Sequence, residues 1–118
     1  MAAVLVTAWA TTLAGWPGPA QAGEELVGTD ITRFEATDVA WVGTVSSASE
    51  ECVVHRAARV FEKVKGERRI FIGRDHTNKK GNFKVPFPTG EPVPGEYRVK
   101  VPATQTCQLA WEAMLIEE

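Results

Sequence analysis

The stretch from Asp75 to Phe83, DHTNKKGNF, gathers an acid, an imidazole, amides and ammonium groups, as a ligand site would. A calcium loop of the EF-hand type alternates oxygen ligands, turns at a glycine in its sixth place and ends on a bidentate glutamate. In this frame Lys79 falls at the third ligand place, Gly81 comes one residue late, and no such glutamate follows. Because an ammonium group repels a divalent cation, we expect no calcium site here.

Other residues with catalytic or metal-binding chemistry are sparse. His55 and His76 are the two histidines, and two ligands are too few for a zinc site. We interpret His55 as a surface residue at the start of a strand rather than as a general base. Glu50 and Glu51 are loop neighbours whose carboxylates should point apart, unlike the paired acids of a glycosidase. We therefore expect no catalytic residue, no metal and no cofactor.

An anion site is a further candidate, because basic residues crowd one end of the same region. They are Arg68, Arg69, Arg74, Lys79 and Lys80. The acids Glu62 and Glu67 are interspersed and weaken the positive field. Lysines also commonly prevent edge strands from pairing with other chains. The favoured interpretation is a solvated strand edge and turn.

Residues 1–22 have the features of a secretory signal peptide. They carry no charged residue, their apolar part is too short to span a bilayer, and Pro17 and Pro19 follow it. Ala20-Gln21-Ala22 has the small-x-small pattern of a cleavage site. A basic residue at the start is missing, and a membrane anchor is the alternative. We expect residues 23–29 to form a flexible leader and residues 30–118 to form the domain.

Size and charge suit one globular domain. The chain has 118 residues, 44% of them hydrophobic, which is enough for one packed core. Its formal net charge is −2, whereas nucleic-acid binding calls for a strongly basic protein. We expect no nucleic-acid partner and no stable membrane insertion once the signal peptide is removed.

Cys52 and Cys107 predict one structural disulfide. They are the two cysteines of a chain that the signal peptide would export to an oxidising compartment. The bridge would close a loop of about 56 residues, which the chain-entropy model values at roughly 4 kcal/mol. The wide spacing gives neither a CxxC redox motif nor a clustered zinc site.

Short β-rich runs follow one another from Ile31 onward, and no helical period is sustained. Apolar and polar residues alternate in several of them, as in strands with one face on a core. Asn78 and Gly81 are turn residues that predict a hairpin setting the register of the next strand. Seven short strands predict an all-β fold, a seven-stranded antiparallel sandwich or a small barrel. The runs are 31–35, 40–45, 56–64, 69–75, 82–87, 96–101 and 109–116.

Motifs in these runs resemble the secreted β-sandwich modules related to carboxypeptidase regulatory-like and transthyretin-like domains, in their two-cysteine variant. The resemblance covers about residues 30–118. The matching positions are Gly43 and Val45, Arg56, Ala58 and Val60, Thr77, Asn78, Gly81, Phe83 and Val85, and Gly95, Tyr97 and Val101. The resemblance implies an Ig-like Greek-key sandwich without catalytic residues. The last strand departs from the family because it is apolar on both faces.

Two apolar runs give a candidate contact surface. Phe71 lies between two isoleucines, and the last strand carries Trp111, Met114 and Ile116. Together they could contact a partner, and packing of both faces in the core is the alternative. We expect a secreted, non-catalytic module with a structural or binding role, whose partner is a protein or a cell-envelope polymer. The alternative is a small secreted hydrolase or a ligand-sequestering protein on the same fold.

Overall fold

The computed structural model describes residues 25–64, 66 and 68–117, so the expected signal peptide at 1–22 lies outside the described residues. The described part of the chain contains seven strands. Each strand agrees with its predicted run to within one residue at either end. They are β2 (Asp30–Ala36), β3 (Ala40–Ser46), β4 (Ala57–Val64), β5 (Arg68–His76), β6 (Asn82–Pro86), β7 (Gly95–Val101) and β8 (Ala110–Ile116).

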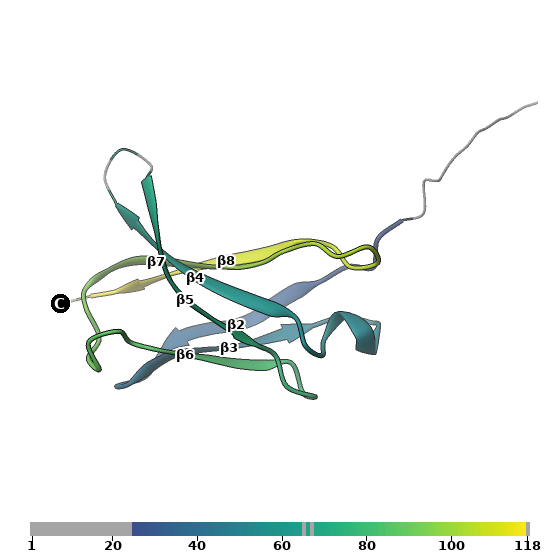
Figure 1. Ribbon diagram of the computed structural model, residues 1–118, viewed down its shortest axis with the longest axis horizontal. Helices are drawn as coiled ribbons and strands as arrows, with labels where there is room; N and C mark the ends of the chain where they lie inside the picture. The colour runs from purple at the N-terminus through teal and green to yellow at the C-terminus, as the bar shows by residue number, and fades with distance from the viewer. Residues whose placement is uncertain (1–24, 65, 67, 118) are drawn as a thin grey trace, which may run out of the picture.

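The strands form two antiparallel sheets that face each other (Figure 1). One sheet has the order β2-β3-β6 and the other the order β5-β4-β7-β8. A short 3-10 helix, Glu50–Cys52, lies in the connection between β3 and β4. The all-β prediction is therefore confirmed, as two packed sheets. No helix in the described part of the chain is long and apolar enough to cross a membrane.

The core lies between the sheets and is built from the alternating apolar residues that the sequence indicates. Val99 on β7 and Val85 on β6 are both buried. Trp41 packs against Phe87 and Tyr97, with ring centroids 4.6 and 4.7 Å apart. Burial, and then the negative charge of Glu62, raises the pKa of the Tyr97 hydroxyl, which donates a hydrogen bond to the Val93 carbonyl oxygen. Since inner positions alternate with outer ones, this core fixes which side chains must face outward.

The turn at Asn78 and Gly81 is confirmed, but it does not join a hairpin. Gly81 has φ +84°, and the Asn78 side chain accepts hydrogen bonds from the amides of Lys80 and Asn82. The strands on either side, β5 and β6, belong to different sheets. The prediction of a hairpin was wrong because turn chemistry fixes a change of direction and does not determine whether the chain stays in one sheet.

A β-bulge interrupts the pairing of β4 with β5. Val60 pairs with Gly73, whereas the next residue, Phe61, pairs with Phe71, so Ile72 is an extra residue. Ile72 packs against the core. The shift places Phe71 on the outer face beside Phe61, where their ring centroids lie 5.6 Å apart. The bulge thus moves an aromatic side chain from the sheet interior to its outside.

Candidate anion-binding face

The four predicted contact residues do not form one surface. Phe71 and Trp111 are 52% and 60% exposed and point outward from β5 and β8, the two edge strands of the four-stranded sheet. Met114 and Ile116 are partly buried and pack against the core. β8 is apolar on both faces because its inner residues cover the core while its outer residues stay exposed. A contact role for Met114 and Ile116 therefore stays a prediction, and the structure places both side chains against the core.

The outer face of the four-stranded sheet carries most of the remaining chemistry, and we call it the cationic face. In β4 the inner residues Ala58 and Val60 are buried, so Arg59 points outward. Arg98 in β7 lies between buried Tyr97 and buried Val99 and points outward as well. The cations of this face are Arg59, Lys63, Arg69, Arg74, Arg98 and Lys100.

Strand register places these cations in rows across the sheet. Directly paired residues share a face of the sheet. The first row is Arg74, Arg59, Lys100 and Trp111; the second is Phe71, Phe61, Arg98 and Ala113; the third is Arg69, Lys63, Glu96 and Leu115. Among these described positions Glu96 is the single carboxylate. The face thus combines concentrated positive charge with three aromatic rings, although the whole chain is slightly acidic.

Two of the arginines lie against aromatic rings. The guanidinium carbon of Arg69 is 5.8 Å from the centroid of the Phe61 ring, and that of Arg98 is 5.4 Å from the Trp111 centroid. Cation–π contacts of this kind contribute about 0.5–1 kcal/mol at exposed sites. They hold the planar guanidinium groups in place while leaving N–H donors at their edges.

Arg98 has few polar partners for its donors. Its one ion pair in the described chain joins Nη2 to the Glu96 carboxylate at 3.5 Å, and its Nε has no hydrogen-bond partner there. The side chain is partly exposed. The Nε is buried, so the terminal nitrogens, with one weak ion pair, are the donors with which Arg98 can bind an oxyanion.

The outer face of the three-stranded sheet differs in charge and composition. Arg33 there pairs with Glu35 at 3.3 Å, and the Thr44 hydroxyl donates to the Asn82 side-chain oxygen at 2.9 Å. Lys84 is the other cation of this face and no described aromatic residue points outward from it. Its charges are mixed and its polar groups bond one another.

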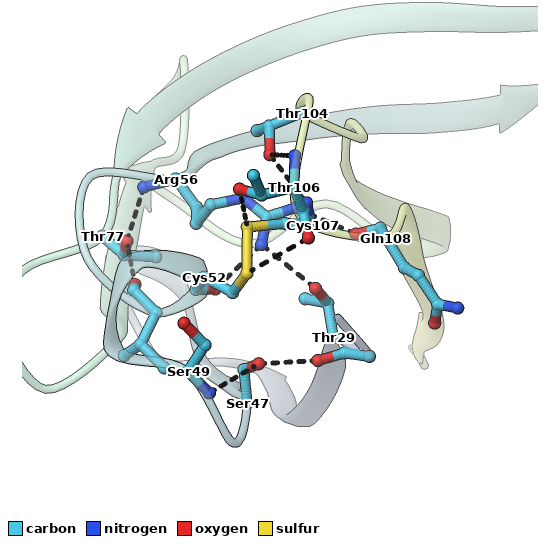
Figure 2. Close-up of a disulfide and its surroundings, with 12 residues drawn as sticks. Thr29, Ser47, Ser49, Cys52, Arg56, Thr77, Thr104, Thr106, Cys107 and Gln108 are labelled. Carbon is cyan, nitrogen blue, oxygen red and sulfur yellow. Dashed lines mark hydrogen bonds between the residues drawn. A yellow bond between two sulfur atoms is a disulfide. The ribbon is translucent and has the colours of Figure 1, made fainter. Parts of the chain in front are cut away.

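The predicted disulfide is present at one end of the sandwich. Cys52 and Cys107 are joined at 2.05 Å, and both residues are buried (Figure 2). Nearby, the amide of Val27 donates to the Thr106 carbonyl oxygen and the amide of Gln108 donates to the Val27 carbonyl oxygen. The predicted flexible leader is therefore held in place at Val27, and the domain extends before the predicted boundary at residue 30.

Arg56 is the central polar residue of this end (Figure 2). It is only 3% exposed. Its two terminal nitrogens donate four hydrogen bonds of 2.8–3.1 Å, to the Thr29 hydroxyl and to the carbonyl oxygens of Cys52, Pro102 and Gln108. Burial lowers the pKa of the Arg56 guanidinium, which nevertheless stays protonated because arginine titrates so high. Sequence motifs gave no sign that this arginine is internal.

The remaining sequence candidates are dispersed. We expected His55 at the start of a strand, but it lies in the turn before β4, with φ +56°. Lys79 and Lys80 lie in the turn after β5 and not on a strand of the cationic face. In residues 25–64, 66 and 68–117 no three His, Cys, Asp or Glu residues come together as metal ligands.

Comparison with known proteins finds no relative. No protein-family model matches the chain, and neither a curated protein nor a solved structure shows significant similarity to it. The functional argument therefore rests on the geometry of the cationic face.

Proposed function

We propose that this protein is a non-catalytic binding module that holds an acidic polymer on its cationic face. The observation that carries the proposal is the enrichment of cations on one sheet surface, where the described positions hold six cations and one carboxylate, that of Glu96. Four of the six are arginines, which keep their charge at any physiological pH. Such groups bind anions and do not exchange protons, which suits adhesion rather than acid–base catalysis.

The spacing of the face suits a polymer better than a single small anion. Strands lie about 4.8 Å apart, and outward residues of one strand follow each other at roughly 6.8 Å. The cations lie on three neighbouring strands, β5, β4 and β7, and therefore form an array roughly 10 Å wide. An array of that extent can contact several charges of one chain at once, and each weak contact adds to the total affinity.

We place this activity outside the cytoplasm. The disulfide between Cys52 and Cys107 supports an oxidising compartment, as do the signal-peptide features of residues 1–22. The acidic polymers there include polysaccharides of the cell envelope and its surroundings. The Greek-key connection of the strands and kinship with carboxypeptidase regulatory-like or transthyretin-like modules remain part of this proposal, supported by the two-sheet architecture and the motif order.

Affinity chromatography tests the proposal. We expect the full chain to bind heparin and polygalacturonate resins at about 50 mM NaCl, and to elute before about 500 mM because screening removes charge contacts. Neutral dextran resin, run in parallel, should not retain it. Passage through both acidic resins at low salt would disprove the proposed function.

A further inference from the structure

A shallow hollow lies within the cationic face, between its two arginine–aromatic pairs. Its volume is about 210 Å³. Phe61 and Arg69 line one side, and Arg98 and Trp111 line the other, so the hollow crosses the middle strands of the sheet. Val99, Lys100 and Leu109 complete the lining. The hollow thus combines three cations with apolar side walls.

The arginines of the hollow are oriented before any ligand arrives. Each guanidinium lies over an aromatic ring, which limits its rotation. In Arg98 the Nε is buried, so a ligand would meet the terminal nitrogens. A planar guanidinium binds carboxylate and sulfate groups through paired N–H donors, a geometry that the single ammonium of Lys100 cannot provide. Fixing the donors in advance lowers the entropy lost on binding.

The same contacts argue against recognition of nucleic-acid bases. Single-stranded nucleic acid binds by stacking its bases on free aromatic faces. Here Arg69 covers a face of Phe61, and Arg98 covers a face of Trp111. Phe61 and Phe71 also meet edge-on, at 64° between their planes, and so do not form a continuous flat platform. The rings serve to hold the cations in place.

We propose that this hollow is a subsite for one acidic sugar unit of the polymer, bound through its carboxylate or sulfate group by Arg69 and Arg98. The proposal rests on the proposed function. A hollow of about 210 Å³ suits a single sugar ring rather than an oligomer. The apolar C–H face of the ring would pack against Leu109 and the exposed edges of the aromatic residues.

Matched pairs of substitutions separate the hollow from the general charge of the face. Arg69→Gln with Arg98→Gln removes two cations that line the hollow. Arg59→Gln with Arg74→Gln removes two cations of the same face that are paired with each other and lie outside the hollow lining. Both variants lose the same charge, and thermal unfolding of each should match that of the unmodified chain.

The measurement is a calorimetric titration of the full chain with a heparin tetrasaccharide and, separately, with tetragalacturonate. We expect the hollow variant to lose at least about tenfold in affinity and the matched variant less than about threefold. Tetragalacturonate carries carboxylates alone, so its tighter binding would identify the carboxylate as the bound group, whereas heparin offers both carboxylates and sulfates. Equal losses in the two variants would overturn the subsite while leaving the proposed function intact.

Two further outcomes are decisive. If the unmodified chain binds neither acidic saccharide, the proposed function itself fails. If single-stranded oligothymidylate or anionic phosphatidylglycerol vesicles bind more tightly than both saccharides, at equal salt, the acidic-sugar assignment is wrong. Glucuronate alone should shift the Trp111 indole N–H resonance in the unmodified chain and not in the hollow variant.

Discussion

Two arginines of this protein, Arg56 and Arg98, show how one side-chain type can serve the fold or a ligand. Arg56 is buried, and its terminal nitrogens are fully engaged with backbone carbonyl oxygens and one hydroxyl. Arg98 is partly exposed, lies over Trp111, and has the Glu96 carboxylate as its one described polar partner. Arg56 has no donor to spare at its tip, whereas Arg98 has several.

The different roles of Arg56 and Arg98 come from their surroundings in the fold rather than from the type of side chain. Arg56 joins segments distant in sequence, including the disulfide loop and the residues before β8, and so it acts as an internal cross-link. Arg98 sits on the opposite side of β7 from the core and contributes little to holding the sheets together. Arg56 is therefore part of the fold, whereas Arg98 keeps terminal donors for the binding that we propose for the cationic face.

The largest expected effect is on the fold, from Arg56→Met. Four buried or partly buried acceptors would lose their donors, and we expect the free energy of unfolding to fall by about 4 kcal/mol. Urea denaturation measures the change. The affinity of the remaining folded protein for heparin should stay unchanged. A loss of stability below about 1 kcal/mol would show that Arg56 is not a structural cross-link.

Gly81→Val should come next, with a loss of about 2–4 kcal/mol. A β-branched residue is strained at φ +84°, and its Cβ would clash with the Val45 carbonyl oxygen. Gly90→Val is the matched control, because Gly90 has φ +80° but open space around its Cβ position. Thermal unfolding should show the smaller loss in the control, and equal losses would mean that the clash does not matter.

Trp111→Ala should lower the affinity for heparin by about three- to fivefold, because Arg98 loses the ring that orients it. The cost in stability should stay below about 1 kcal/mol, since Trp111 is mostly exposed. Leu115→Ala is the control on the same strand and face, with similar exposure and no part in the hollow. Calorimetry and urea denaturation of both variants measure the two effects. Equal losses of heparin affinity in Trp111→Ala and Leu115→Ala would contradict the role of Trp111.

The smallest effect is expected on the other sheet. Arg33→Gln with Lys84→Gln removes two cations from the outer face of β2-β3-β6, and we expect less than about a twofold change in heparin affinity. Titration at the same salt as for the unmodified chain checks this. A loss as large as that of Arg69→Gln with Arg98→Gln would mean that overall charge, rather than one face, governs binding.

Sequence reasoning predicted the local features of the fold well. Alternation located every described strand, and the pairing of Cys52 with Cys107 followed from their number and setting. Tyr97, Val99 and Val101 alternate with Glu96, Arg98 and Lys100 along the sequence, which is the pattern of a strand with one polar face. Such features depend on neighbouring residues and are readable without tertiary structure.

The cationic face was not predictable in the same way, because it depends on which strands become neighbours. Arg98 faces Phe61 only because β7 pairs with β4, although 37 positions separate them in the chain. The bulge at Ile72 likewise moved Phe71 outward and has no clear local signal. A count of charges along the chain gave a slightly acidic protein and concealed the segregation of cations onto one sheet.

The most direct test of the central claim is a heparin titration of the variant that replaces Arg59, Arg69, Arg74 and Arg98 by glutamine together. All four point from the outer face of one sheet, so the fold should survive and circular dichroism should be unchanged. We predict an affinity at least about thirtyfold weaker than that of the unmodified chain, at about 100 mM NaCl. An affinity within about twofold of the unmodified chain would contradict the assignment of binding to the cationic face.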